Sequence, residues 1–428
     1  MAKDDILEDL ELSSRTGAAR PIGRLEGLFP ALSHRNFQLY TIGQVISLVG
    51  FWLQQVGVGY LIFHMTHSEF WVGVAAAVSG LPFLLFTMFA GVFIERMDKK
   101  RLLFMTQISE ATTCIILGVL ALTNHATLPV VLFLVFVIGV IEAVDLPTRF
   151  TFLIEMVGKE DLSSAVPINN SLFNTARFVG PAAAGILIAA TSVGWTFILN
   201  GISFLAGIWA IYQVKPIYSP HLDTDTHPFE SLKIGIKYSF THPKIMYFIL
   251  LGFCSAIFIW PFQALMPAIA DKVFSSGAHG LGSLLSAAGA GSLTGAIFTS
   301  VNSKKKNKIP YILFGILISS LGLLAFSINR NFLLAHVFLY VSGFGILTMI
   351  STMNALVQVY APDSMRARIN AVYLAMLVGM MPLGSLLAGF FAQHTSSMFV
   401  LGTYSIIMIA IAAALYFKGV FANLATNP

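Results

Sequence analysis

The chain has 428 residues, of which 56% are hydrophobic and only 11% are charged, and its formal net charge is +5. Soluble globular proteins are about 45–50% apolar and about 25% charged, so this composition excludes an ordinary soluble protein. It also excludes a disordered chain, because such chains are poor in apolar residues. The two cysteines are too few for a disulfide scaffold. We therefore expect an integral membrane protein.

Twelve apolar stretches are long enough to span a membrane as helices, since about 20 helical residues cross the hydrocarbon core. They are continuous, whereas the strands of a membrane barrel alternate apolar and polar residues. The predicted spans are residues 36–63, 70–94, 101–123, 128–156, 165–190, 194–214, 245–271, 280–301, 309–328, 331–360, 367–392 and 397–418.

The lysines and arginines predict the orientation of these spans. The chain begins with an acidic, polar stretch, which is unlike the basic start of a signal peptide. If both termini lie on one side, that side holds all but four of the 25 basic residues. Of those four, Lys272 and Arg330 lie on the opposite side, and Arg149 and Arg177 lie within spans. Because basic loops stay in the cytoplasm, both termini are expected there, and the net charge requires no nucleic-acid partner.

The two sets of six spans show signs of a duplication. Span five reads NNSLFNTARFVGP at 169–181 and span eleven reads NAVYLAMLVGMMP at 370–382, each with Asn and Pro twelve positions apart. An apolar face at 229–240 predicts an amphipathic helix on the inner leaflet. The predicted organisation is a cytoplasmic tail (1–35), a six-helix bundle (36–214), a cytoplasmic linker (215–244), a second six-helix bundle (245–418) and a cytoplasmic tail (419–428).

The loop after span two reads GVFIERMDKKR at 91–101. It resembles a signature of major facilitator transporters: a glycine, three residues, an acid, an arginine and further basic residues. Glutamate stands here where the family usually has aspartate. The resemblance implies a cytoplasmic latch that joins the two halves in the outward-open state, formed by Gly91, Glu95, Arg96, Asp98 and Arg101. The alternative is that this loop, like NSKKKNK at 302–308, is only a topology signal.

Charged residues also occur inside spans four and five. A charge at bilayer depth costs about 2.5–3.5 kcal/mol on insertion scales, so it usually faces a cavity or a partner. Glu142, Asp145 and Arg149 share one helical face, and Asp145 and Arg149 can pair. Arg177 in span five is expected at the depth of Glu142, as a base beside an acid. These residues either couple transport to protons or form a fixed network between helices, and both hypotheses stay open.

A longer pattern identifies a subgroup. From Asp145 onward the chain has an Asp-x-Pro-x-Arg run, a Gly-x-Glu-Asp-Leu loop and an Asn-x-x-Arg-x-x-Gly-Pro turn. With the segments at 29–55 and 366–389, it resembles the bacterial efflux subgroup of the major facilitator superfamily that contains the enterobactin exporter and macrolide-type drug:proton antiporters. Thr148 and Phe150 depart from the usual pattern. The resemblance covers residues 29–418 and implies an all-α membrane protein of twelve transmembrane helices in two pseudo-symmetric halves.

In this fold, spans one, four, seven and ten line the substrate cavity. Amide and aromatic side chains in these spans and at the start of span five are the candidates for the cavity wall, although an intramembrane amide can equally bond two helices together. The candidates are Gln44, Phe51, Gln55, Asn170, Asn174, Trp260, Gln263, Asn354 and Gln358.

The sequence thus predicts a secondary transporter, not an enzyme. It has neither a phosphate-binding Gly-x-x-x-x-Gly-Lys-Ser/Thr loop nor a His-Glu-x-x-His pair, so no catalytic residue, cofactor or metal site is predicted. We expect a monomer in the bacterial inner membrane that exports a small amphipathic molecule, siderophore-like or a drug, by proton-coupled alternating access. The alternatives are a transporter of lipid or lysolipid between leaflets and a membrane-embedded enzyme. The residues do not identify the substrate or the coupling ion.

Overall fold

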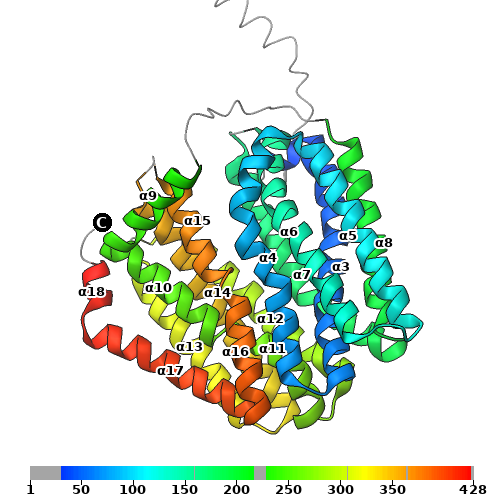
Figure 1. The fold of residues 1–428 in the computed structure, drawn as a ribbon. Helices are drawn as coiled ribbons and strands as arrows, with labels where there is room; N and C mark the ends of the chain where they lie inside the picture. The colour runs from blue at the N-terminus through cyan, green and yellow to red at the C-terminus, as the bar shows by residue number, and fades with distance from the viewer. Residues whose placement is uncertain (1–29, 159, 216–227, 306, 363–364, 426–428) are drawn as a thin grey trace, which may run out of the picture.

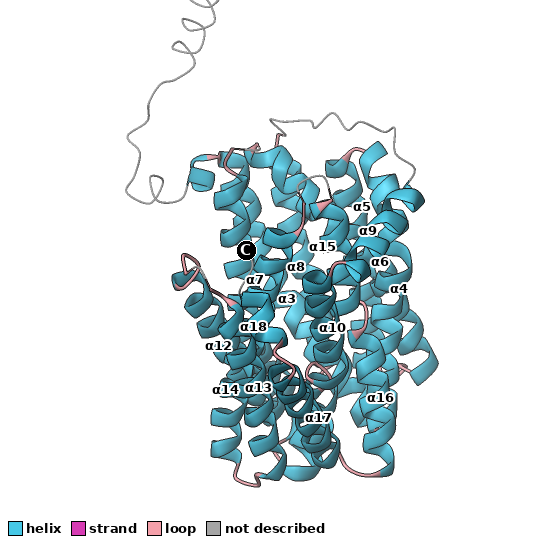
Figure 2. Ribbon diagram, turned by 90° about the vertical axis from the view of Figure 1, so that its left-hand side faces the viewer, coloured by secondary structure: helices cyan, strands magenta, loops and turns pink. Residues whose placement is uncertain are grey.

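Helices make up the regular structure of the chain. The computed structural model describes residues 30–158, 160–215, 228–305, 307–362 and 365–425. Every regular element in these ranges is helical, and short loops join the helices (Figure 2). Twelve helical segments there are long and apolar enough to cross a membrane, which confirms the predicted number of spans. The predicted tail at 1–29 and most of the predicted linker, 216–227, lie outside the described ranges.

The first half of the molecule consists of six antiparallel helices, because the loops between them are too short for any other path. A short helix, η1 (Pro30–Ser33), precedes them. The six helices are α3 (Arg35–Thr66), α4 (Glu69–Arg96), α5 (Lys99–Leu122), α6 (Leu128–Val157), α7 (Leu162–Ala190) and α8 (Gly194–Gln213).

The second half also has six spans, two of which are interrupted. Proline lacks an N–H and clashes with the preceding turn, so the breaks lie at Pro261 and just before Pro382. The seventh span is α10 (Pro243–Phe258), α11 (Phe262–Ala268) and η2 (Ile269–Val273) in succession, and the eleventh is α15 (Arg366–Leu377) and α16 (Met381–His394). The others are α12 (Gly277–Val301), α13 (Ile309–Ile328), α14 (Phe332–Tyr360) and α17 (Ser397–Phe417).

Two further helices lie outside the spans. α9 (Pro228–Thr241) covers the helix predicted at 229–240, packs beside α15, and exposes Ile236 and Phe240. Its placement on a leaflet remains a prediction. α18 (Val420–Ala425) was not predicted, since residues 419–428 were expected to be a tail; it buries Phe421 and Leu424 against the second half.

The two halves meet at one end of the bundle and separate toward the other, as Figure 1 shows. We call the end that carries α9 and the loop between α4 and α5 the linker face, and the opposite end the far face. Across the interface, α4 packs against α16 and α7 packs against α12. Glycines allow these pairs to approach: a Cβ on Gly73 would lie 2.6 Å from the carbonyl oxygen of Ser385, and a Cβ on Gly282 would lie 2.4 Å from that of Pro181.

Polar contacts close the far face. The Nζ atom of Lys272 lies 2.8 Å from Oε1 of Glu69, and the hydroxyl of Ser68 donates to Oε1 of Gln393 at 2.7 Å. The apolar core of the second half also continues into the first half there, through α3 and the far end of α7. The structure is therefore closed at the far face, and the helices of the two halves separate toward the linker face (Figure 1).

Candidate functional site

A cavity of about 760 Å³ lies between the two halves. Helices of both halves line it. In membrane proteins built from two repeated halves, the interface between the halves is where substrate and coupling-ion sites lie. All four ionisable candidates and seven of the nine amide and aromatic candidates line this cavity: Glu142, Asp145, Arg149 and Arg177, and Gln44, Phe51, Gln55, Asn170, Trp260, Gln263 and Asn354.

Two amide candidates are not among the lining residues. The side chain of Asn174 donates to the carbonyl oxygen of Asn170 one turn earlier, at 2.9 Å. Gln358 lies one turn closer to the linker face than Asn354, is exposed, and donates to its Oδ1 atom at 3.1 Å. Both amides therefore contact their own helix.

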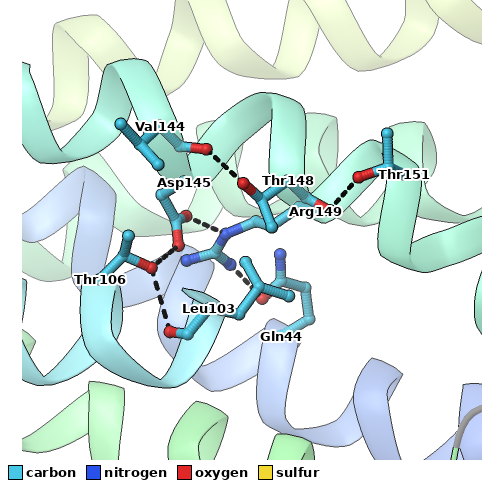
Figure 3. A network of polar contacts seen from close by, with 8 residues as sticks. All are labelled: Gln44, Leu103, Thr106, Val144, Asp145, Thr148, Arg149 and Thr151. Atoms are coloured by element: carbon cyan, nitrogen blue, oxygen red, sulfur yellow. Dashed lines mark hydrogen bonds and ion pairs between the residues drawn. The ribbon is translucent and has the colours of Figure 1, made fainter. Parts of the chain in front are cut away.

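Asp145 and Arg149 form the predicted ion pair, at the centre of a network from three helices (Figure 3). Thr106 of α5 donates to Oδ1 of Asp145 at 2.6 Å, and Nη1 of Arg149 donates to Oε1 of Gln44 of α3 at 2.6 Å. The side chain of Asp145 is only 4% exposed. A carboxylate this deeply buried requires both the cation and the hydrogen bond, because an unpaired buried charge is costly.

Threonines bridge the turn that Pro147 disturbs within α6. Thr148 donates to the carbonyl oxygen of Val144 at 2.6 Å, and Thr151 donates to that of Thr148 at 2.9 Å. Pro147 itself leaves the carbonyl oxygen of Ala143 without its helical N–H donor, and the threonine bonds are made to neighbouring carbonyl groups. α6 is continuous through this turn and the ion pair.

A third carboxylate, Glu110 of α5, belongs to the same wall, and the sequence analysis missed it. Glu110 is buried, lines the cavity, and interacts electrostatically with Glu142, Asp145 and Arg149. Its position in the middle of span three is the signal that would have identified it, by the same rule that singled out span four. Among the described residues, no group of three or more His, Cys, Asp or Glu side chains could hold a metal ion.

Charge is unbalanced on this wall. Three carboxyl groups share the single cation of Arg149, which pairs with Asp145. Within the described part of the chain, neither Glu110 nor Glu142 forms an ion pair. These two acids are therefore free to change protonation without breaking a salt bridge.

Arg177 has surroundings other than those expected. It does not pair with Glu142; its guanidinium carbon lies 4.5 Å from the ring centroid of Trp260 and 5.4 Å from that of Trp52. Trp52 comes from α3 of the first half, and Trp260 from the break between α10 and α11 in the second. The sequence predicted a base beside an acid at this position. The structure instead places the Arg177 cation beside two indole rings.

Local sequence brings these three side chains together. Gly180 follows Arg177 by one turn, and a Cβ there would lie 2.3 Å from Cβ of Trp52, so only glycine lets α3 come this close. The break at Pro261 holds Trp260 in a turn between two helices. No pattern along the chain pairs these tryptophans with Arg177, and the role of Trp52 was not predicted.

The described side chains of the predicted latch contact only the first half. Asp98 caps α5 by accepting from the backbone N–H of Arg101 at 2.7 Å, and Arg101 is exposed. Neighbouring Lys99 lies 3.6 Å from Glu155 of α6, measured from Nζ to Oε1. The side chains of Glu95 and Arg96 lie outside the described part of the structure, and Gly91, which has no side chain, lies within α4, so the latch remains a prediction.

Comparisons with known proteins agree with this architecture. Residues 26–425 match the family described as transmembrane secretion effector. The enterobactin exporter EntS of Escherichia coli is 26% identical over 368 residues, covering 83% of this chain and 85% of that protein. The staphyloferrin A transporter of Staphylococcus aureus is 24% identical over 233 residues, covering 54% of this chain and 58% of that protein.

Solved structures share the fold at low sequence identity. The nucleoside transporter NupG has a TM-score of 0.69 at 12% identity, with 92% of this chain and 100% of that chain covered. A bacterial homologue of the human lysosomal transporter Spinster, in an inward-facing and unoccupied conformation, has a TM-score of 0.71 at 13% identity, with 92% and 98% covered. At such identities the likeness concerns the fold alone.

Proposed function

Because the chain belongs to the transmembrane secretion effector family of major facilitator transporters, as its motifs predicted, we propose that it exports a small amphipathic molecule across the inner membrane. The named relatives are an enterobactin exporter and a staphyloferrin A transporter, which favours a siderophore-like cargo. The cargo would occupy the central cavity, whose aromatic and amide walls suit a molecule with apolar and polar parts.

The observation that carries this proposal is a central cavity with unpaired acids on one wall, closed at one end of the molecule. We assign the linker face to the cytoplasm, since nearly all lysines and arginines belong to that side. With this orientation the cavity is in its inward-facing arrangement, ready to take cargo from the cytoplasm. Export would then require the far-face contacts to break and the linker face to close.

Proton coupling is the second part of the proposal. Glu110 and Glu142 lack ion-pair partners among the described residues, so each can gain a proton when the cavity opens outward and release it when the cavity opens inward. A membrane potential of 100 mV contributes about 2.3 kcal/mol for each charge moved across it. One inward proton for each exported molecule therefore suffices for a concentration ratio of more than tenfold.

The loop at 91–101 would act in the outward-facing state, in which the linker face is closed. When the linker face closes, the second half approaches this loop, and exposed Arg101 could meet a carboxylate of that half. Rocking of one half against the other is how transporters built from repeated halves alternate their access.

Transport by the purified full-length chain in liposomes tests the proposal. Enterobactin, staphyloferrin A and a lysolipid serve as separate cargoes, and their movement is measured with and without a proton gradient. We expect gradient-driven movement of at least one siderophore that stops when a protonophore is added. Movement of the lysolipid alone would favour the lipid alternative, and movement insensitive to the protonophore would exclude proton coupling.

A further inference from the structure

Arg177 is a cation in the cavity wall without a counter-ion among the described residues. It lines the central cavity about halfway along α7. Within the described residues it has no ion-pair partner. Glu110 and Glu142 interact instead with Asp145 and Arg149. The two indole rings beside Arg177 stabilise the cation through their faces but supply no negative charge.

The two side chains that flank this cation carry a hydrogen-bond donor each and no acceptor. A guanidinium has five N–H groups and no acceptor, and an indole has a single N–H. The Nε1 atoms of Trp52 and Trp260 are buried, and neither has an acceptor among the described residues. Buried donors are normally satisfied, so these two N–H groups beside a cation would gain from an acceptor that a ligand brings within reach when the side chains adjust.

Aromatic side chains extend this cluster. The rings of Phe51 and Phe173 lie 5.5 Å and 5.8 Å from the ring of Trp52, measured between centroids, and both residues line the cavity. A ligand that reaches Arg177 therefore lies against an apolar surface. The site combines one fixed positive charge, unpaired donors and aromatic walls.

We propose that Arg177, Trp52 and Trp260 form a subsite for a carboxylate carried on an aromatic or apolar body. The planar fork of a guanidinium fits the two oxygens of a carboxylate. A carboxylate brings one negative charge, which one arginine balances, whereas a phosphate monoester brings up to two and would leave one uncompensated in an apolar cavity. The inference rests on the proposed function, because it assigns a charge to the exported molecule.

The subsite also spans the interface between the halves. Arg177 and Trp52 belong to the first half and Trp260 to the second, and a Cβ on Gly289 of α12 would lie 2.4 Å from the carbonyl oxygen of Arg177. Movement of one half against the other changes the distance from Trp260 to Arg177. A bound carboxylate would therefore contact Trp260 differently in the inward-facing and outward-facing states. Release on the outer side requires such a difference between the states.

Binding of two probes of similar size and shape, one anionic and one neutral, tests the proposal. Radiolabelled 2-naphthoate and its neutral amide, 2-naphthamide, are measured by equilibrium dialysis against the full-length chain in nanodiscs, with empty nanodiscs as the blank. We expect naphthoate to bind at least tenfold more tightly than naphthamide. In Arg177→Gln the two affinities should become equal, and in Arg177→Lys part of the preference should return. Arg330→Gln is the matched control, because Arg330 is exposed and outside the cavity lining.

Trp52→Phe supplies a second measurement that keeps a ring but removes a donor. It should weaken naphthoate binding several-fold and naphthamide binding less, because a hydrogen bond to a carboxylate is stronger than one to a neutral amide oxygen. Equal binding of the two probes by the unaltered protein, or a preference that survives in Arg177→Gln, would overturn the proposal. Efflux without any charge preference would refute only this subsite, whereas a charge preference without efflux would refute only the transport function.

Discussion

Lys272 and Glu69 join the two halves of the molecule at the far face, with 2.8 Å between Nζ and Oε1. The side chain of Glu69 is 6% exposed and that of Lys272 is 46% exposed, so the carboxylate is buried and the lysine is partly in contact with solvent. Lys272 also lies over the ring of Phe63, with Nζ 5.4 Å from the centroid. Any opening of the far face must separate these groups.

Removal of Lys272 should favour opening at the far face. Lys272→Ala leaves Glu69 buried without its cation, and since the lysine is half-exposed, we expect a loss of about 1–2 kcal/mol, less than for a fully buried pair. This corresponds to roughly a tenfold gain in the far-face-open population. A cysteine at Ala76, which lines the cavity, reports it through a membrane-impermeant maleimide added at the far face.

That measurement requires a background in which Cys114 and Cys254 are replaced by serine. Arg330→Ala, which removes a cation at the far end of α13 without touching the other half, should leave the labelling rate unchanged. An unchanged rate in Lys272→Ala as well would mean that the ion pair does not contribute to closure.

The unpaired acids should determine the pH dependence of transport. Glutamine imitates a permanently protonated carboxyl group, so Glu110→Gln and Glu142→Gln should each reduce gradient-driven efflux at least tenfold. In the double variant, downhill movement of cargo, which needs no proton exchange, should continue at a rate that no longer varies with pH. Initial rates in liposomes over a series of external pH values check this, and efflux that still follows pH in the double variant would contradict the assignment.

The ion pair of Asp145 and Arg149 should act mainly on stability. Arg149→Met leaves Asp145 buried and unpaired, which costs about 3–5 kcal/mol. Asp145→Asn should cost less, because the side chain of Arg149 is 13% exposed, against 4% for Asp145, and keeps its hydrogen bond to Gln44. The double variant should recover part of the loss. Denaturant-induced unfolding of the three variants gives the coupling energy, and purely additive losses would show that the two charges do not interact.

The sequence predicts the spans well because bilayer thickness sets a length that apolar stretches must meet, and each predicted span overlaps a helix. The pair of Asp145 and Arg149 was predictable for a similar reason, since four residues place two side chains on one helical face. Arg177 differs, because its neighbours Trp52 and Trp260 come from separate helices in separate halves. Such contacts depend on how the halves meet, which no local pattern along the chain encodes.

The seam between α7 and α12 should be sensitive to a single methyl group. A Cβ on Gly282 would lie 2.4 Å from the carbonyl oxygen of Pro181 and 2.7 Å from Cα of Gly185. Both are backbone atoms, so they cannot move aside as the end of a flexible side chain can. Gly282→Ala should therefore push the two helices apart at the far face, at a cost of about 1–3 kcal/mol for overpacking.

Spin labels at Thr191→Cys and His279→Cys report this separation, because both positions are exposed near the far ends of α7 and α12. In Gly282→Ala the distance distribution between them should shift toward longer values, as the closed seam is lost. Gly59→Ala is the matched control: it also lies between the halves, but its nearest neighbour is a side-chain atom, Cγ of Pro267, at 3.3 Å. If both variants gave the same distribution as the parent protein, close glycine packing would not be what holds the far face shut.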